Sequence, residues 1–518
     1  RNPIKNLAKA TTERNKVLDA MLENGFISKE VCEKTKAEDL GASVMTPEKR
    51  AAMQDEGKKV WRMNRFAAPY FVEEVRQFIL DEFQKDQVFG DGLEVYTTVD
   101  MRLQRAAEKA LLGALDDFDA KRLDQLKRAG KEEEFLPVSG AMVCIDNREP
   151  YKGFVRALVG GRDFEKEKFN TATQARRQAG SSIKPFVWAA AVANGRTAST
   201  VIDDAPFVRV GANGKAWTPK NFDGKYGGPT SLRHALEKSV NIVSVKLVEQ
   251  LGVPVVRSFL QGCGIETNVE GLTIGLGTPE VTPLEHCAAY STFPNGGVRY
   301  DPVMIREIRD RDGLPRYDYK DYQKTTQALD PAVAYVVLHM MEGVCTPDAS
   351  LNLYPTGHRT SALGRPRAGK TGTTNYSRDT WFCGYTPDYT TVVWIGYRDN
   401  RPLGKGPDYT GGRLACPIWT NFMIDAEDGL PVRDFDVPDG VNFFNINRIQ
   451  GTAGGPYKEA YLKGTSPPAA WTPPATAPPA EGTPAVSASD LPAPAEDKGL
   501  LDALPGDEQA APTISSDF

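Results

Sequence analysis

Residues 178–195 read QAGSSIKPFVWAAAVANG, and this stretch decides how the rest of the chain is interpreted. Its apolar run predicts a helix from Ser181 to Asn194, with Pro185 in the first turn, where the missing backbone N–H is not needed. Ser181 and Lys184 are three residues apart, so their side chains share one face. A serine hydroxyl attacks well only when a base takes its proton, and a lysine can be that base only if its pKa is depressed. Burial at a helix start would lower that pKa, and the helix dipole would stabilise an oxyanion.

An S-x-x-K pattern is a weak signal by itself, since about two would occur by chance in a chain this long. A second motif, S-x-N, has two candidates. Ser239 and Asn241 lie between two periodic helical stretches in LRHALEKSVNIVSVKLVEQLG, where a short break could project polar side chains into a cleft. Ser350 and Asn352 lie among prolines, as expected for an exposed loop. We therefore choose the first pair.

The third motif is Lys370-Thr371-Gly372-Thr373, shortly before the strand-like TWFCGY. By composition a K-T-G triplet should appear only about 0.1 times in such a chain, so it is the most specific of the three. A strand edge with a lysine, threonine hydroxyls and a small glycine can bind a carboxylate and let an extended peptide approach the backbone. We expect this segment to bind substrate.

The same region contains a competing pattern. Residues 364–371, GRPRAGKT, match the phosphate-loop motif G-x-x-x-x-G-K-[ST]. That motif needs a hydrophobic strand before it and a helix after it. Here HRTSAL precedes it, and TGTTNYSRD, rich in turn and strand formers, follows. A nucleotide-binding protein therefore remains a distant alternative.

Other chemistries have little support in the sequence. There is no G-x-S-x-G and no H-E-x-x-H, and the four histidines are expected to be packing or surface residues: His234, His286, His339 and His358. The seven cysteines are scattered without a C-x-x-C pair, so we expect small core residues, no zinc site and no disulfide framework. A net charge of −5 argues against a nucleic-acid partner, because binding phosphates needs a basic face. We expect neither a metal nor a cofactor.

The strand signals define the fold class. GAMVCID at 140–146 and VRALVGG at 155–161 flank the turn-rich NREPYKG, and TWFCGYT and YTTVVWIGY flank Pro387 and Asp388. Early and late hairpins with helices between them predict an α+β fold, with an antiparallel sheet of about five strands flanked by helices. Before them, Asp100 is a plausible N-cap for a helix that places Leu103, Ala107, Ala110, Leu111 and Leu115 on one face.

Three longer segments resemble a known family beyond the motifs. ALVGGRDFEKEKFNTATQARRQAGSSIKPF, WTPKNFDGKYGGPTSLRHALEKSVN and KTGTTNYSRDTWFCGYTP are similar to the bifunctional class A penicillin-binding proteins, over roughly residues 60 to 465. The beginning, NPIKNLAKATTERNKVLDAMLENGFIS, resembles the end of their glycosyltransferase domain. The resemblance implies the penicillin-binding protein and β-lactamase-like transpeptidase fold.

With that resemblance, the chain divides into five expected parts. Residues 1–64 are the remnant of a glycosyltransferase domain, 65–137 a connecting subdomain, 138–428 the transpeptidase domain and 429–465 a C-terminal segment packed on it. Residues 466–518, rich in Pro and Ala, are expected to be disordered. No apolar stretch reaches the roughly 18 to 20 residues of a membrane helix, so the family's anchor is expected upstream of Arg1.

The resemblance also implies a mechanism and roles. Ser181 would attack the D-Ala-D-Ala carbonyl of a stem peptide, with Lys184 as the base, Ser239 relaying a proton, Asn241 holding the acyl chain and Lys370 lowering the local proton affinity. Thr371 and Thr373, beside Gly372, would bind the terminal carboxylate, and the backbone N–H groups of Ser181 and Thr373 would form the oxyanion hole. β-Lactams, nascent glycan strands and cell-wall regulators are implied partners, at the periplasmic face of the inner membrane. A β-lactamase, which would turn penicillin over, and an inactive β-lactam sensor are the nearer alternatives.

Overall fold

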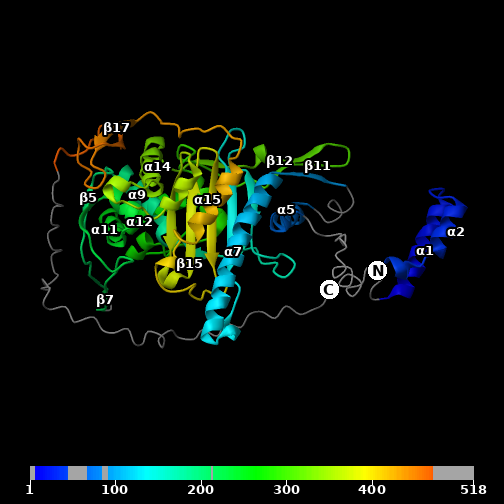
Figure 1. The fold of residues 1–518 in the computed structure, drawn as a ribbon. Coiled ribbons are helices and arrows are strands. Elements are labelled where there is room, and N and C mark those ends of the chain that lie inside the picture. The colour runs from blue at the N-terminus through cyan, green and yellow to red at the C-terminus, as the bar shows by residue number, and fades with distance from the viewer. Residues whose placement is uncertain (1–5, 45–66, 84–91, 212–213, 471–518) are drawn as a thin grey trace.

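The computed structural model describes residues 6–44, 67–83, 92–211 and 214–470 (Figure 1). Its central feature is a five-stranded sheet with the strand order β14-β15-β16-β2-β3, in which every neighbouring pair is antiparallel. The strands are β14 (Ala368–Thr373), β15 (Asp379–Tyr385), β16 (Tyr389–Gly396), β2 (Ser139–Asp146) and β3 (Val155–Val159). Both hairpins predicted from the sequence are confirmed, as is the α+β class with five strands. Strand β14 lies at the edge of the sheet.

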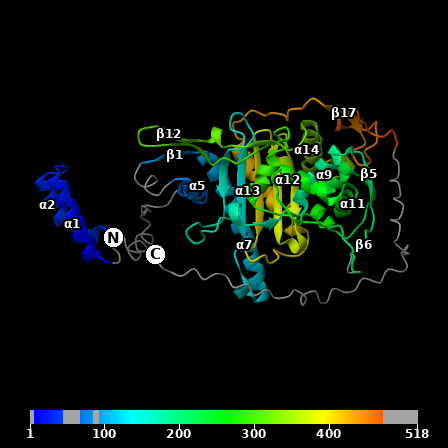
Figure 2. The same ribbon diagram turned by 180° about the vertical axis from the view of Figure 1, so that it is seen from behind.

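Helices cover both faces of this sheet, because alternate residues of each strand point to opposite sides. In β2, Ala141, Val143 and Ile145 belong to one hydrophobic core, whereas Met142 and Cys144 belong to a second. Figure 1 shows α7 (Met101–Ala129) and α15 (Ala415–Ala426) in front of the sheet, and Figure 2 shows α12 (Val253–Gly262) and α13 (Pro283–Ser291) on the other face. All eight residues of β2 and of β16 are buried, as expected for strands covered on both sides.

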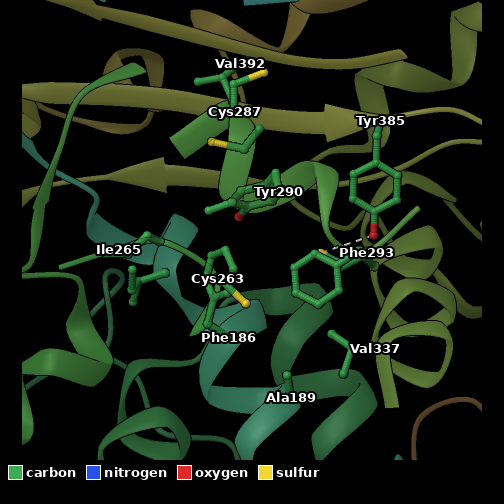
Figure 3. Packing of buried hydrophobic residues seen from close by; sticks show 14 of the residues in the cluster. Phe186, Ala189, Cys263, Ile265, Cys287, Tyr290, Phe293, Val337, Tyr385 and Val392 are labelled. Carbon is green, nitrogen blue, oxygen red and sulfur yellow. Dashed lines mark hydrogen bonds between the residues drawn. The ribbon is translucent and has the colours of Figure 1, made fainter. Parts of the chain in front are cut away.

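The first core is built around α9 (Lys184–Ala193), a helix buried at nearly every position. A helix that is apolar all round is stable only when other elements surround it. Its Phe186 ring packs edge-on against Tyr290 at 5.5 Å and lies 5.4 Å from Phe293 (Figure 3). The nearby helices are α10 (Leu232–Lys238), α11 (Asn241–Leu251) and α14 (Pro331–Cys345). This packing fixes the start of α9, where Lys184 lies.

The helix predicted from Ser181 is corrected in one respect. Residues Gly180–Ile183 form the 3₁₀ turn η2, and the α-helix begins only at Lys184. Gly180 has a φ of 55°, and its N–H donates to the Gly277 carbonyl at 2.9 Å, so the chain enters the helix from a tertiary contact. Ser181 and Lys184 still lie toward one side of this turn.

The second core holds α7 on the sheet. Asp100 caps it by accepting hydrogen bonds from the backbone N–H groups of Arg102 and Leu103, and the helix ends at Gly130 with a φ of 65°. Leu103, Ala107, Leu111 and Leu115 are buried as the sequence predicted, and Ala110 is partly buried. Although α7 falls within the predicted connecting subdomain, it packs directly on the five-stranded sheet.

Shorter strands and helices surround the five-stranded sheet and its two cores. Strand β1 (Glu94–Thr97) pairs with β11 (Ile305–Arg309), which pairs with β12 (Pro315–Asp318). Four further antiparallel pairs are β4 (Arg177–Gln178) with β9 (Glu280–Val281), β5 (Val201–Asp204) with β8 (Gly228–Ser231), β6 (Arg209–Val210) with β7 (Ala216–Trp217), and β10 (Val298–Tyr300) with β13 (Thr325–Gln327). The remaining helices here are α5 (Pro69–Glu82), α8 (Thr171–Gln174), η1 (Glu132–Glu134), η3 (Leu272–Leu276), η4 (Tyr319–Asp321), η5 (Ala349–Leu351), η6 (His358–Leu363), η7 (Asn375–Ser377) and η8 (Pro407–Tyr409).

The C-terminal hairpin of β17 (Val441–Ile446) and β18 (Tyr457–Leu462) packs on α14, and a buried ion-pair network joins it to α10. Arg233 of α10 donates to both carboxylate oxygens of Glu459. It also reaches Glu237 at 3.2 Å, and Glu237 accepts from Arg448 at 3.0 Å. Breaking such a pair leaves a buried charge uncompensated, which costs about 3–5 kcal/mol. The hairpin therefore fixes α10, the helix that ends at Ser239.

Helices α1 (Leu7–Glu23), α2 (Lys29–Ala37) and α3 (Leu40–Ser43) pack on one another near the N-terminus. The five predicted domain boundaries stay predictions, and the tail predicted to be disordered lies outside the described residues from 471 onward. All seven cysteines are buried and free, as expected of small core residues. In the described ranges, no helix has both the length and the apolar character needed to cross a bilayer.

Candidate active site

Two buried lysines meet at one serine hydroxyl. Lys370 Nζ donates to Ser239 Oγ at 2.9 Å, and Lys184 Nζ lies 3.3 Å from the same oxygen. Lys184 also donates to the Ser239 carbonyl at 2.7 Å and to Asn241 Oδ1 at 2.8 Å. Both lysine side chains are 0 % exposed. The three sequence motifs therefore fold into one cluster.

The S-x-N segment reaches this cluster because its backbone is turned sharply. Ser239 ends α10 with a φ of 59°, a left-handed conformation that costs a non-glycine residue roughly 1–2 kcal/mol. This turn directs both the carbonyl and the hydroxyl of Ser239 toward Lys184. Asn241 then begins α11, and its N–H donates to Asn221 Oδ1 at 2.8 Å, while its amide nitrogen donates to the Lys220 carbonyl at 3.0 Å. Asn221 thus orients Asn241, a role that no sequence pattern indicated.

Burial and mutual repulsion set the charges of the two lysines. Burial lowers the pKa of Lys184 well below its ordinary value of 10.5, and the neighbouring charge of Lys370 lowers it further. Burial lowers the pKa of Lys370 to about 7. Both causes favour the uncharged amine at Lys184, which lies beside a lysine that holds its proton about half of the time at pH 7.

A neutral amine has two N–H donors and one lone pair. At Lys184, the Ser239 carbonyl and Asn241 Oδ1 are both strong acceptors at short distance, so they take the two donors. The lone pair is left to accept a proton. The Ser181 hydroxyl, half-buried on the preceding turn, makes no hydrogen bond to any of the described residues and is free to donate one.

The turn η2, which carries Ser181, packs backbone to backbone against the K-T-G strand. A Cβ on Gly180 would lie 2.9 Å from the Thr373 carbonyl oxygen, and one on Gly277 would lie 1.8 Å from the Gly180 oxygen. A Cβ on Gly372 would lie 2.8 Å from the Ala179 oxygen. Glycine at these positions lets η2 approach the end of β14 closely. Ser181 is the second residue of η2, where a backbone N–H has no acceptor within the turn.

The two threonines of the strand differ in whether their hydroxyl protons are already used in a hydrogen bond. Thr371 is 5 % exposed, and its hydroxyl donates to Thr356 Oγ1 at 2.9 Å. Thr373 is less buried and accepts from the Gly411 N–H at 3.1 Å, so its own hydroxyl proton is available. Of the two, Thr373 is the better oriented to donate to a carboxylate.

The alternative assignments do not fit this arrangement. Ser350 lies exposed in η5, where its hydroxyl donates to Asp348. Residues 364–371 do not form a phosphate loop, because Lys370 and Thr371 lie inside strand β14, which leads into the short turn η7 and strand β15 and not directly into an α-helix. Among the described residues, no group of His, Cys, Asp and Glu side chains is arranged to hold a metal ion.

His286 was expected only to pack, and the structure gives it a specific contact. Its Nε2 lies 2.8 Å from Ser182 Oγ, which donates its own proton to the Ala179 carbonyl at 2.6 Å. Ser182 must therefore accept from a protonated Nε2, which makes Nδ1 the unprotonated nitrogen, and Nδ1 is buried without a partner among the described residues. Burial lowers the pKa of His286 to about 3, so the ring stays neutral. It clamps the turn that carries Ser181.

We expect His286→Leu to lower the acylation rate constant with benzylpenicillin by roughly 10-fold or more, because the Ser182 hydroxyl loses its donor and the turn its clamp. His286→Gln, which can still donate, should recover most of that rate. Because His286 does not titrate between pH 5 and 9, the variants should lower the whole pH–rate profile without moving its limbs. His358→Leu on η6 is the control, and a profile shifted along the pH axis would show that His286 acts otherwise.

Comparison with known proteins agrees with this fold. Residues 140–423 match the family described as the penicillin binding protein transpeptidase domain. Penicillin-binding protein 1A of Neisseria lactamica is 42% identical over 312 residues, which is 59% of this chain and 38% of that protein. The chain thus matches well under half of the length of that relative, and 64% of the length of penicillin-binding protein 1A of Neisseria flavescens.

Solved structures show the same likeness. Penicillin-binding protein 1A from Haemophilus influenzae is 25% identical with a TM-score of 0.72, covering 90% of this chain and 84% of that one. PonA1 from Mycobacterium tuberculosis, solved in complex with penicillin V, is 26% identical with a TM-score of 0.59, covering 76% and 100%. The fold is that of an acyl-transferring penicillin-binding domain. The chain belongs to the penicillin-binding protein transpeptidase family, and within it to the class A proteins.

Proposed function

We propose that this chain is the D,D-transpeptidase part of a bifunctional peptidoglycan synthase and that it acts through an acyl-enzyme on Ser181. The observation that supports this most directly is the meeting of Lys184 and Lys370 at the Ser239 hydroxyl, beside the turn of Ser181. A buried lysine with a lowered pKa, three residues after a free serine hydroxyl, is the arrangement that nucleophilic catalysis by serine requires without a histidine base.

In the proposed acylation, Ser181 Oγ gives its proton to the Lys184 lone pair and attacks the carbonyl carbon of the penultimate D-Ala. The backbone N–H groups of Ser181 and Thr373 stabilise the oxyanion. The proton then passes from Lys184 through the Ser239 hydroxyl to the nitrogen of the leaving D-Ala, as the C–N bond breaks. The Lys370 ammonium donates to Ser239 Oγ, which favours this direction of transfer.

The substrate is proposed to lie along the free edge of β14, as an added strand. Its terminal carboxylate would bind the hydroxyls of Thr371 and Thr373, next to the Lys370 charge, while Asn241 holds the acyl chain. The amine of a neighbouring stem peptide then attacks the ester carbonyl, releases Ser181 and forms the crosslink. A β-lactam would acylate Ser181 in the same way, because its ring carbonyl takes the place of the D-Ala carbonyl.

The remaining proposals concern the longer protein. We place its glycosyltransferase active site outside this chain and expect it to extend nascent glycan strands. An anchor elsewhere in the protein would hold it at the periplasmic face of the inner membrane, where cell-wall regulators could bind it. The expectation that transpeptidation needs no cofactor stays a prediction.

Intact-mass measurement after incubation with benzylpenicillin tests the proposed function. We expect one penicilloyl adduct that persists for many minutes and maps to the peptide containing Ser181, together with D-Ala release from a soluble D-Ala-D-Ala peptide. Rapid loss of the adduct with continued penicillin hydrolysis would indicate a β-lactamase. An adduct without any D-Ala release would indicate a sensor, and an adduct on another residue would refute the assignment of Ser181.

The lowered pKa of Lys370 predicts how the acylation rate constant changes with pH. If its ammonium is needed, the acylation rate constant should fall as the pH rises through its pKa of about 7, because the proton is then lost. The rate should rise on the acidic side as Lys184, whose pKa is also lowered, loses its proton. In Lys370→Arg the descending limb should move beyond pH 9, since a guanidinium keeps its charge. A limb that stays near pH 7 in this variant would exclude Lys370 as its origin.

A further inference from the structure

The start of α11, the helix that carries Asn241, has no capping side chain of its own. The residue before the helix is Val240, whose side chain cannot accept a hydrogen bond. A distant segment supplies the cap, because Asn221 Oδ1 accepts from the backbone N–H of Asn241 at 2.8 Å and from that of Ile242 at 3.2 Å. The first N–H groups of a helix have no partner within it, so this oxygen fixes where α11 begins.

The other end of the Asn221 amide is held by a buried carboxylate. Asn221 Nδ2 donates to both oxygens of Asp204, at 2.8 and 3.0 Å, and to the Lys225 carbonyl at 2.8 Å. Asp204 is the last residue of β5 and is 4 % exposed. One of its oxygens also accepts from the Gly227 N–H at 2.8 Å. Among the described residues, N–H groups rather than a charged side chain therefore compensate this carboxylate.

An ionised carboxylate fixes the direction of this amide because it can only accept hydrogen bonds. An asparagine amide can turn over, which exchanges its donor and acceptor ends. With Asp204 and the Lys225 carbonyl on one side, both hydrogens of Asn221 Nδ2 are used there, and the amide oxygen must face the N–H groups of α11. A turned amide would bring oxygens together at Asp204 and N–H groups together at the helix. Asp204 thus selects one orientation of Asn221.

The chain of contacts ends at Lys184. The amide nitrogen of Asn241 donates to the carbonyl of Lys220, the residue before Asn221. Asn241 Oδ1 accepts from Lys184 Nζ at 2.8 Å. This oxygen and the Ser239 carbonyl take the two hydrogens of the neutral amine, which leaves its lone pair free. A displacement of Asn221 would therefore move the helix start and the acceptor of the Asn241 amide together.

We propose that Asp204 is a positioning residue for the acylation of Ser181. It acts through Asn221 and Asn241, which hold the lone pair of Lys184 toward that serine. This role rests on the proposed function, in which Lys184 is the base. Asp204 itself contacts neither the substrate nor the reacting atoms. Without it, Asn221 can turn over and Asn241 loses a fixed anchor, and a misplacement of about 1 Å can cost on the order of 10²-fold in rate.

The first test is Asp204→Asn, which keeps the shape of the side chain and replaces one accepting oxygen by a donor. An amide at this position can face Asn221 either way round. We expect the second-order rate constant for acylation by a fluorescent penicillin to fall by roughly 10-fold or more. Asp203→Asn, one residue earlier on β5, is the matched control, because successive side chains of a strand point to opposite faces. It should acylate at the rate of the unaltered protein.

The pH profile separates positioning from a general loss of structure. The hydrogen bond to Asn241 Oδ1 favours the charged form of Lys184, so weakening it should lower the pKa of this lysine further. The rising, acidic limb should therefore move to lower pH in Asp204→Asn. The other charged group facing Lys184 is Lys370, which donates to Ser239, and its descending limb should stay in place. A uniformly lowered profile with both limbs unmoved would overturn the positioning role.

An exchanged pair keeps the test decisive if Asp204→Asn folds poorly. Asn221→Asp alone brings two carboxylates together and should lose more activity than Asp204→Asn. When the two changes are combined, the new amide donates to the new carboxylate, which still accepts from the N–H groups of α11, so most of the rate should return. A combined variant that keeps the low rate of Asp204→Asn, or an unchanged rate in Asp204→Asn itself, would overturn the inference. Neither result affects the proposed function, which fails only if benzylpenicillin does not acylate Ser181 in the unaltered protein.

Discussion

Ser181→Ala is expected to abolish the covalent adduct with benzylpenicillin and to lower D-Ala release by at least about 10⁴-fold. Without the hydroxyl no ester can form, and the oxyanion donors and the lysines have no attacking atom to assist. The change removes one oxygen from a half-buried side chain that makes no hydrogen bond to the described residues, so the melting temperature should barely change. Intact-mass analysis measures the adduct, and a thermal melt reports folding.

Ser350→Ala provides the matched control, because it alters the other S-x-N serine in an exposed turn. That variant should form the adduct at the rate of the unaltered protein. If Ser181→Ala still acquired a stable adduct, a different nucleophile would carry the reaction. The cluster around Ser239 would then need another explanation.

Lys184→Met is expected to lower the acylation rate constant by about 10²- to 10⁴-fold, the usual contribution of a general base. Methionine fills a similar volume in the buried position but offers no lone pair of comparable basicity. Lys184→Arg distinguishes the loss of the neutral amine from the loss of the positive charge. A guanidinium keeps the positive charge but cannot lose its proton in a protein, so it should be as inactive as methionine if the neutral amine is what matters.

The measurement is the second-order rate of acylation by a fluorescent penicillin, followed across pH 5 to 9. Lys246→Met, which alters a partly buried lysine on α11 that donates to the Asp203 carbonyl, controls for removing a lysine from this region. Near-normal acylation in Lys184→Arg would show that Lys184 contributes charge rather than proton transfer. Equal losses in Lys246→Met would attribute the effect to packing.

Much of the fold could be predicted because its signals are local. The hairpins of β2 with β3 and of β15 with β16 follow from short apolar runs around turn-rich links. The Asp100 cap and the buried face of α7 follow from helical spacing. The start of α9 was placed three residues early, because the conformation of η2 depends on the hydrogen bond from Gly180 to the distant Gly277. The packing of α7 on the sheet was likewise not visible in the sequence.

The candidate site was found from the order and composition of three motifs, yet two of its features had no local signal. Asn221 caps α11 and orients Asn241 from 20 residues away. His286 clamps the turn that carries Ser181, through a contact with Ser182 that spans 104 residues. A histidine in an apolar helix looks the same in sequence whether it packs or donates to a serine. The two cases are distinguished only by the residue beside the ring in space, which here is Ser182.

The sequence by itself determined which groups are available: a serine and a lysine on one turn, a serine and an asparagine at a helix break, and a lysine with threonines on a strand. It did so because each motif lies within a few residues, where spacing fixes relative direction. Only the tertiary structure decided that Lys184 and Lys370 share the hydroxyl of Ser239 across 55 and 131 residues. The lowered pKa of each lysine depends on this tertiary arrangement. The elements packed around the lysines exclude water, and that exclusion is not a property of the residues themselves.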